Sequence, residues 1–346
     1  MPAVSSGPGH GRIHWFARLE HRLHAWREGR ARRRGHQPTI VPFPGYGGPG
    51  WVRVVGRVLI LPPRRRPRQG SPARGWRSFA GIPVSSATVT IHIDGVDHDV
   101  IADRGGVIDT VIPAELAAGW QTISMSVENR TAAETSVFVV SDDTTFGVVC
   151  DVDDTVMVTA LPRPLVAAWN SFVVDEHARM PVPGMAVLLD RLMTENPNAP
   201  MVYLSTGAWN VAPTLSRFLS RHLFPRGAFL LTDWGPTHDR WFRSGQKHKL
   251  DNLRRLAQQF PHVRWLLIGD DGQHDPAIYT TFAREYPEQV AGIAIRRLLP
   301  AEAVLAGARG AEDTPAAHTP WVSGHDGARL HERLIEEGIM RASGSS

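Results

Sequence analysis

The 346-residue chain is long enough for about two domains, and its 42% hydrophobic content is ordinary for a globular protein. It contains neither a run of 18 apolar residues, as a membrane-spanning helix requires, nor an N-terminal signal-peptide core, so a cytoplasmic protein is expected. The net charge of +4, without a recognisable nucleic-acid-binding module, argues against a nucleic-acid partner, and the single cysteine, Cys150, excludes an internal disulfide.

Residues 1–49 are expected to form a basic N-terminal helix and a linker. The predicted helix, residues 12–34, places its apolar side chains at helical spacing: Ile13, Phe16, Leu19, Leu23 and Trp26. This stripe can pack on the main body of the protein. Alternatively, it can lie on an anionic membrane, where basic amphipathic helices with aromatic anchors bind. A second basic cluster, residues 62–68, is expected to be a solvated loop that is compatible with acidic lipid headgroups.

Residues 50–141 are predicted to form a small antiparallel β-sandwich. Five segments rich in β-branched residues are separated by Gly, Asp and Asn turns: 52–61, 87–93, 107–112, 121–127 and 135–140. In residues 88–93 polar and apolar side chains alternate, as they do in a half-buried strand. We identify no catalytic constellation in this segment, which is therefore expected to be a binding or positioning module.

Residues 142–300 are predicted to form an α/β domain with a doubly wound parallel sheet, because strand and helix patterns alternate along them. Strands are expected near residues 146–152, 200–205, 228–232, 264–268 and 290–295. Helices are expected near residues 184–195, 210–223, 246–260 and 275–285. Residues 301–346 follow as a linker and a short C-terminal helix.

The stretch Asp151-Val-Asp-Asp-Thr155 directly follows the first of these strands. Side chains two residues apart project to the same side of an extended chain, so Asp151 and Asp153 can reach one small volume. Two close carboxylates repel unless a cation or a shared proton relieves them, which favours a divalent metal beside a phosphoryl group. An EF-hand is excluded, because Val156 and Pro162 stand where it needs Gly and Glu. A solvated acidic turn is the remaining alternative.

Three later segments supply the other parts of a phosphate site. Ser205-Thr-Gly207 ends a second strand, and a hydroxyl with free backbone N–H groups at a helix start can hold a phosphate. Lys249, or Lys247 two residues earlier, opens the next helix and can place an ammonium against a phosphate oxygen. Asp270 ends a further strand and, with Asp151, would supply oxygen ligands for Mg²⁺. Each signal is weak alone, but their order predicts one site.

This order of motifs resembles the haloacid dehalogenase phosphatase superfamily. More narrowly, residues 146–298 resemble the catalytic domain of the fungal actin-patch-type phosphatidate phosphatases and their bacterial relatives. Four stretches carry the resemblance: residues 151–157, 204–210, 233–236 and 269–275. Upstream, residues 42–47 and the β-rich segment also look like the bacterial members of the family.

The resemblance implies a chemical role for each acidic residue. Asp151 would be the nucleophile that forms an aspartyl-phosphate, since a carboxylate nucleophile splits one difficult step into two. Asp153 would protonate the leaving alkoxide and then deprotonate the attacking water, with its backbone carbonyl on the metal. Asp270 would be a metal carboxylate, with Asp271 or Asp275 as the second. The expected metal set is therefore Asp151, Asp153, Asp270 and Asp275, holding Mg²⁺.

The remaining site residues would bind the phosphoryl group. Ser205 would donate a hydrogen bond to a transferring oxygen, with Thr206 and the N–H of Gly207 as close alternatives. Thr155 belongs to the same substrate-binding set. Lys249 would balance charge on the nucleophile and the phosphoryl group; it is preferred to Lys247 because the family tends to carry His-Lys at this point.

The short intervals between the motifs leave little room for a large cap, and an open site suits a bulky lipid phosphate or a phosphoprotein. The tryptophans near the motifs, Trp169, Trp209, Trp234 and Trp241, are candidates for the core or for acyl-chain contacts. Arg240 and Arg243 are candidate headgroup contacts or plain surface charges.

The resemblance implies a Mg²⁺-dependent phosphatase that converts phosphatidate to diacylglycerol and contacts an anionic membrane peripherally. The same chemistry on soluble phosphomonoesters or phosphoproteins is the first alternative. A membrane-associated binding protein with a vestigial catalytic domain is the second, although every expected catalytic position carries a competent residue.

Overall fold

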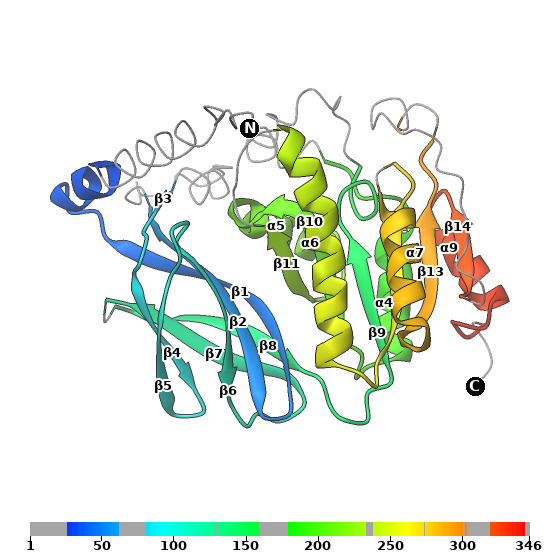
Figure 1. Cartoon of the computed structure of the whole chain (residues 1–346), viewed down its shortest axis with the longest axis horizontal. Coiled ribbons are helices and arrows are strands. Elements are labelled where there is room, and N and C mark those ends of the chain that lie inside the picture. Colours follow the sequence, from blue (N-terminus) through cyan, green and yellow to red (C-terminus); the bar gives the residue numbers. More distant parts are fainter. Residues whose placement is uncertain are drawn as a thin grey trace, which may run out of the picture.

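The computed structural model describes residues 26–61, 81–128, 130–158, 179–232, 238–272, 274–299, 302 and 319–342, with the backbone alone for residues 238–244. Two units lie side by side: a curled N-terminal β-sheet and a layered α/β unit (Figure 1). None of the helices in the described ranges is long and apolar enough to cross a bilayer.

The N-terminal unit is one hydrogen-bonded sheet of eight strands in the order β3-β2-β1-β8-β7-β4-β5, with β6 also paired to β2. The strands are β1 (Pro38–Gly48), β2 (Trp51–Ile60), β3 (Ile82–Pro83), β4 (Thr88–Ile93), β5 (Val96–Ile101), β6 (Val107–Pro113), β7 (Gly119–Val127) and β8 (Ala133–Val139). Every neighbouring pair is antiparallel except β1 and β8, which run parallel. The sheet curls around an apolar core that includes Val54, Ile91 and Met125. The sequence predicted a small antiparallel sandwich of five segments, and these correspond to β2, β4, β6, β7 and β8. The structure instead shows one curled sheet with one parallel pair, to which β1, β3 and β5 also belong.

The unit begins earlier in the chain than the sequence indicated. Residues 38–48, expected in a linker, form strand β1, and its pairing with β2 shifts register between Phe43 and Tyr46. A side chain at Gly45 would place its Cβ 2.2 Å from the carbonyl oxygen of Arg53, so the backbones approach too closely for any other residue. The Pro/Gly-rich composition that resembled a linker thus belongs to an irregular strand.

The N-terminal helix is described only in part. Residues 26–33 are helical, and Trp26 is 56% exposed. The rest of the predicted helix and the basic cluster at 62–68 lie outside the described residues.

The second unit contains a parallel sheet of six strands in the order β11-β10-β9-β12-β13-β14. The strands are β9 (Phe146–Asp151), β10 (Met201–Ala208), β11 (Ala228–Thr232), β12 (Arg264–Asp270), β13 (Val290–Arg296) and β14 (Trp321–Gly324). Five of these match the predicted strands. The sixth, β14, lies in the segment expected to be a linker and a helix, so part of that segment completes the sheet.

Helices cover both faces of this sheet. They are α4 (Met185–Glu195), α5 (Ala212–Arg221), α6 (His238–Gln259), α7 (Asp275–Glu285) and α9 (Gly327–Glu336). Buried residues of α4, α5 and α9 share one core with one face of the sheet, and those of α6 and α7 share a second core with the other face. Each predicted helix is present, but α6 begins at His238 rather than near 246.

The direction in which the strand order proceeds reverses beside β9. The chain moves from β9 to β10 and β11 on one side, and then returns to β12 on the other side. Connections that leave in opposite directions open a crevice at the carboxyl ends of the two central strands, where such sheets bind ligands. The acidic motifs follow β9 and β12, so the topology brings them together at this point.

The two units share apolar contacts. Phe43 of β1 stacks on Trp209, with ring centroids 5.2 Å apart, and Trp51 of β2 stacks on Phe260 at 5.6 Å. Tyr46 donates a hydrogen bond of 2.8 Å to Gln259 of α6. Phe43 belongs to the same buried cluster as residues of the parallel sheet. The N-terminal sheet is therefore packed onto the α/β unit through a continuous core.

Truncating this contact tests whether the units unfold together. We expect Phe43→Ala to lower the free energy of unfolding by about 3–4 kcal/mol, because a large buried ring leaves a cavity. Thermal unfolding followed by near- and far-UV circular dichroism should show one transition at a lower midpoint. Ile101→Ala on β5, where the side chain is 73% exposed, is the control and should change the midpoint little. Two transitions, of which only one moves, would contradict a shared core.

Candidate active site

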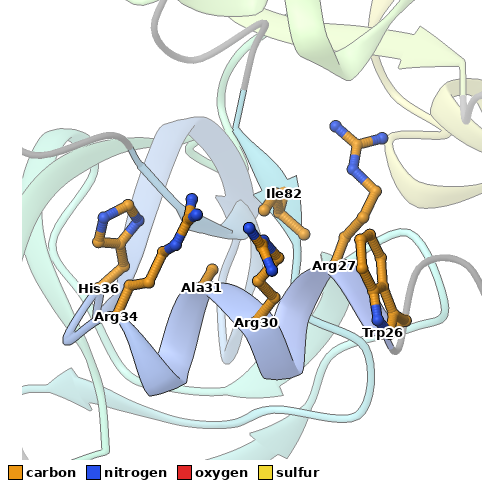
Figure 2. A pocket seen from close by; sticks show the side chains of 7 residues that line it. All are labelled: Trp26, Arg27, Arg30, Ala31, Arg34, His36 and Ile82. Atoms are coloured by element: carbon orange, nitrogen blue, oxygen red, sulfur yellow. The ribbon is translucent and has the colours of Figure 1, made fainter.

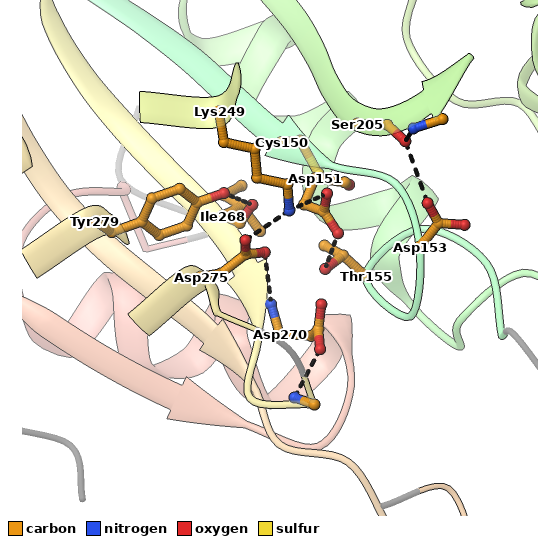
Figure 3. A network of polar contacts seen from close by, with 12 residues as sticks. Cys150, Asp151, Asp153, Thr155, Ser205, Lys249, Ile268, Asp270, Asp275 and Tyr279 are labelled. Atoms are coloured by element: carbon orange, nitrogen blue, oxygen red, sulfur yellow. Dashed lines mark hydrogen bonds and ion pairs between the residues drawn. The ribbon is translucent and has the colours of Figure 1, made fainter. Parts of the chain in front are cut away.

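The loop after β9 directs two buried carboxylates to different partners. Asp151, the last residue of β9, is 1% exposed, and Asp153 is 6% exposed. Ser205 of β10 donates a hydrogen bond of 3.1 Å to Oδ2 of Asp153, and Thr155 donates a longer one of 3.4 Å to Oδ2 of Asp151 (Figure 3). Asp154, between Asp153 and Thr155 in the chain, adopts a left-handed backbone conformation with φ of 57°, which turns the chain back on itself. The loop is thus held by side chains from the neighbouring strand and from its own far end.

A buried lysine links the motifs. Nζ of Lys249, on α6, lies 2.6 Å from Oδ1 of Asp151 and 2.6 Å from Oδ1 of Asp275, and the lysine side chain is 3% exposed. Lys247 is 75% exposed and pairs with Asp251 on the helix surface. Of the two lysines left open by the sequence, the structure places Lys249 in the site.

The loop after β12 contributes the other carboxylates. Asp270 ends β12 and accepts a hydrogen bond of 2.7 Å from the N–H of Gly272. Asp275 is the first residue of α7, and its Oδ1 holds Lys249. Asp271 instead accepts a hydrogen bond of 2.8 Å from the N–H of Leu298. Of the two alternatives for a second carboxylate, Asp275 is the one beside Asp151.

Three of these carboxylates form one compact group. Single oxygens of Asp151, Asp270 and Asp275 all lie within 4.8 Å of one another, and all three residues are buried. The Asp153 carboxylate lies outside this group, toward Ser205. Clustered carboxylate oxygens are the donor set that Mg²⁺ prefers in proteins.

Burial and mutual repulsion govern the charges in this group. Burial raises the pKa of both Asp151 and Asp270 well above the usual value, and repulsion by Asp275 raises the pKa of each further, while Lys249 opposes the shift. Burial by itself would lower the pKa of Lys249, but Asp151 and Asp275 outweigh it and raise that pKa. Lys249 therefore pairs with only two carboxylates of this group of three, so a further positive charge would stabilise the group.

Two buried carboxylate oxygens of the site have no hydrogen-bond donor among the described residues. Oδ2 of Asp270 and Oδ1 of Asp153 accept no hydrogen bond from any part of the chain that the structure describes. An unsatisfied buried oxygen is costly, and native proteins rarely leave one without a partner. The donor set and the free oxygen of Asp270 fit a divalent cation.

The turn Ser205-Thr-Gly207 is held by hydrogen bonds that involve its own backbone. The N–H of Gly207 donates a hydrogen bond of 2.9 Å to Oγ of Ser205, which is itself 1% exposed. The carbonyl of Thr206 accepts a bond of 2.9 Å from Thr232 of β11. Within this Ser-Thr-Gly turn, it is the Ser205 hydroxyl that contacts a site carboxylate, whereas the backbones of Thr206 and Gly207 shape the turn.

Several predicted contacts can be assigned or set aside. Trp209 is 4% exposed and packs on Phe43, so it belongs to the core and not to an acyl-chain rim. The remaining rim and headgroup candidates lie outside the described residues or have no described side chain: Trp169, Trp234, Arg240, Trp241 and Arg243.

Arg296 was not identified from the sequence. It ends β13, is 2% exposed, and its Nη1 donates a hydrogen bond of 2.7 Å to the carbonyl of Asp154. Its Nη2 bonds Glu302 at 2.7 Å, and its own carbonyl accepts a bond of 3.0 Å from the N–H of Asp271. The guanidinium thus binds the loop after β9, while the backbone carbonyl of the same residue binds the loop after β12. The only sequence signal is an arginine directly after the apolar run 290–295.

Removing this guanidinium should loosen the loop after β9. We expect Arg296→Met to cost about 3 kcal/mol of unfolding free energy, because it leaves the partly buried Glu302 and the Asp154 carbonyl without their partner. Chemical denaturation measures the loss, with the exposed neighbour change Arg297→Met as the matched control. Equal midpoints for the two variants would show that the bridge adds no stability.

Part of the chain is similar in sequence to known proteins. Residues 146–297 match the family model of the catalytic domain of phosphatidate phosphatase APP1. The chain is 23% identical over 150 residues to phosphatidate phosphatase APP1 of Saccharomyces cerevisiae, which covers 43% of this chain and 25% of that protein. It is 26% identical over 161 residues to an uncharacterized protein of Schizosaccharomyces pombe, which covers 46% and 26%. The chain thus spans about a quarter of the length of the curated relatives it matches.

Solved structures give only distant similarity. A carbohydrate acetylesterase from Xanthomonas citri covers 86% of this chain and 75% of its own, with 12% identity and a TM-score of 0.27. A likeness at that level carries no argument about fold or function. The family match, in contrast, confirms the family that the motifs indicated for this segment.

Proposed function

We propose that residues 146–297, which belong to the family of APP1-type catalytic domains, form a Mg²⁺-dependent phosphatase with a doubly wound, haloacid dehalogenase-like fold. The proposed reaction converts phosphatidate to diacylglycerol and phosphate. One observation carries the proposal: Asp151, Lys249, Asp270 and Asp275 meet in a buried cluster where β9 and β12 end, beside Asp153 and Ser205. If the six strands of the parallel sheet are numbered by themselves in chain order, from β9 as 1 to β14 as 6, they lie in the order 3-2-1-4-5-6. This order, with helices on both faces of the sheet, supports the fold assignment.

Asp151 is the proposed nucleophile. Its Oδ1 is held by Lys249, whereas Oδ2 accepts, within the described part of the chain, only the long hydrogen bond from Thr155. Oδ2 is therefore the oxygen that we assign to attack phosphorus, forming an aspartyl-phosphate as the bond from phosphorus to the leaving alkoxide breaks. Water then attacks the same phosphorus, which releases phosphate and restores the carboxylate.

Asp153 is the proposed proton donor and acceptor. It gives a proton to the leaving alkoxide in the first step and takes one from the attacking water in the second. The hydrogen bond from Ser205 to Asp153 Oδ2 fixes the direction of this carboxyl group. Ser205 is also near enough to Asp153 to donate to a phosphoryl oxygen placed between the two aspartates, which is the role proposed for it.

Lys249 and the metal carboxylates balance charge. Asp275 holds Lys249 against Asp151, so the ammonium can accompany charge from the nucleophile to the phosphoryl group. Asp151, Asp270 and Asp275, with the backbone carbonyl of Asp153, are the residues that we assign to Mg²⁺. The ion would supply positive charge beside the phosphoryl oxygens.

The lipid assignment depends on the family match. A soluble phosphomonoester or a phosphoprotein would use the same residues, and these remain the alternative substrates. We further propose a cytoplasmic protein that contacts membranes peripherally, because its substrate would lie in a bilayer.

The nucleophile can be tested with an isosteric change. Asp151→Asn should reduce phosphate release by about 10⁴-fold or more, because a neutral amide does not attack phosphorus. Release is measured from short-chain phosphatidate and from p-nitrophenyl phosphate, each with and without Mg²⁺. Asp142→Asn, at an exposed position before β9, is the control and should leave both rates unchanged.

The two substrates separate the alternatives. Asp151-dependent release from the lipid supports the phosphatidate assignment, and release from p-nitrophenyl phosphate alone would discard the lipid while keeping the chemistry. No release from either substrate by a folded protein would favour a vestigial domain.

Metal binding can be tested without turnover. Asp270→Asn should raise the midpoint of thermal unfolding in EDTA, because it removes one charge from a repelling buried group. The same change should abolish the rise on adding Mg²⁺, which for the wild type reflects about 2.7 kcal/mol at a hundredfold excess over the dissociation constant. Asp271→Asn preserves the acceptor for Leu298 and should keep the full Mg²⁺ response. A Mg²⁺ response that survives Asp270→Asn would place the ion elsewhere.

A further inference from the structure

We propose that a basic hollow on the N-terminal unit binds the phosphate group of an anionic ligand at a site separate from the proposed active site. The hollow has a volume of about 250 Å³ and lies between the helix at residues 26–33 and strand β3 (Figure 2). Its lining is Trp26, Arg27, Arg30, Ala31, Arg34, His36 and Ile82. Four of these residues carry or can carry positive charge, and none is acidic.

Helical spacing brings the arginines together. Arg27, Arg30 and Arg34 lie three and four residues apart, so they share one face of the helix, and Figure 2 shows them on the side that faces Ile82. Ala31, which is 5% exposed, lies between them, so no larger side chain fills the floor. The result is a concave surface with charged walls.

The charge on this face is unbalanced within the described chain. Arg32, on the opposite side of the helix, pairs with Glu28 at 3.0 Å and with Glu128 at 2.8 Å. Arg27, Arg30 and Arg34 make no ion pair with any described residue; Arg30 lies only over the ring of Trp26, at 5.7 Å. Like charges at this spacing repel each other and destabilise the helix. A bound anion would reduce this repulsion, and its binding would therefore stabilise the helix.

The side chains match the chemistry of a phosphate group. Guanidinium groups bind phosphate oxygens through paired, charge-assisted hydrogen bonds. Trp26 is 56% exposed beside them, and amphipathic rings of this kind are found at the level of lipid headgroups. The phosphate can therefore belong to a lipid headgroup or be free in solution.

The position of the hollow suits a surface-bound ligand. In Figure 1 the helix at residues 26–33 and the carboxyl ends of the parallel strands both lie toward the top of the view. A membrane across that side would meet the hollow and the proposed active site together.

Two double variants separate the hollow from general electrostatics. Arg30→Gln with Arg34→Gln removes two charges from the hollow, whereas Arg32→Gln with Arg33→Gln removes two charges from the same helix outside it. All four positions are exposed, and equal unfolding midpoints confirm that the fold is intact. The full chain is used in EDTA, so that binding is measured without turnover.

Binding to a lipid headgroup is measured by sedimentation of the protein with phosphatidylcholine vesicles that contain or lack phosphatidylglycerol. Phosphatidylglycerol is a phosphodiester, so its binding does not depend on the proposed phosphatase function. Binding of free phosphate is measured by calorimetric titration of the protein with inorganic phosphate. We expect the hollow variant to weaken binding by about tenfold or more and the control variant to weaken it far less.

Selective loss in the vesicle assay assigns the hollow to a lipid headgroup, and selective loss in the phosphate titration alone assigns it to a soluble phosphate. Equal losses in the two variants, or no loss in either, would overturn the proposal. Because neither assay measures hydrolysis, failure of this proposal is distinguishable from failure of the proposed phosphatase function.

Discussion

The ion pairs of Lys249 are the interaction on which the site depends. Asp151 ends β9 and Asp275 begins α7, and each lies 2.6 Å from the same ammonium. Without that charge, two buried carboxylates would face each other, and removing one partner of a buried pair is strongly destabilising. The lysine therefore holds β9, α6 and α7 in one arrangement. It does not pair with Asp270, whose Oδ2 accepts no hydrogen bond from the described residues. The same charges that order the site leave it short of positive charge.

The N-terminal sheet contributes to this arrangement from outside the catalytic segment. Trp209 follows the Ser205 turn by four residues, and its buried ring rests on Phe43 of β1. Trp51 and Tyr46 contact the end of α6, the helix that carries Lys249. The helix that supplies Lys249 and the turn that directly follows the Ser205 strand are thus packed against the first unit, which makes that unit part of the scaffold of the site.

Much of the α/β unit could be predicted from the sequence because apolar strands and polar loop residues alternate cleanly there. Asp151, Ser205 and Asp270 each end an apolar run, and the carboxyl edge of a parallel sheet brings such ends together. The residue pattern alone did not separate Lys249 from Lys247, because helical position does not say which side chain is buried. The family resemblance favoured Lys249, and the structure buries its side chain and exposes that of Lys247. β1 was missed because prolines and glycines interrupt its pattern, and β14 because four residues give too little periodicity.

Arg296 shows what sequence patterns leave out. A buried arginine has no periodic signature, since its role depends on carbonyls and carboxylates that lie far away in the chain. Its bond to Asp154 reaches the residue whose left-handed backbone lies between Asp153 and Thr155. A strained turn persists only where its surroundings hold it, and here the holding group comes from the end of β13. The direction of the Asp153 carboxyl group is thus fixed from two sides: Ser205 binds the side chain, and Arg296 anchors the adjoining backbone.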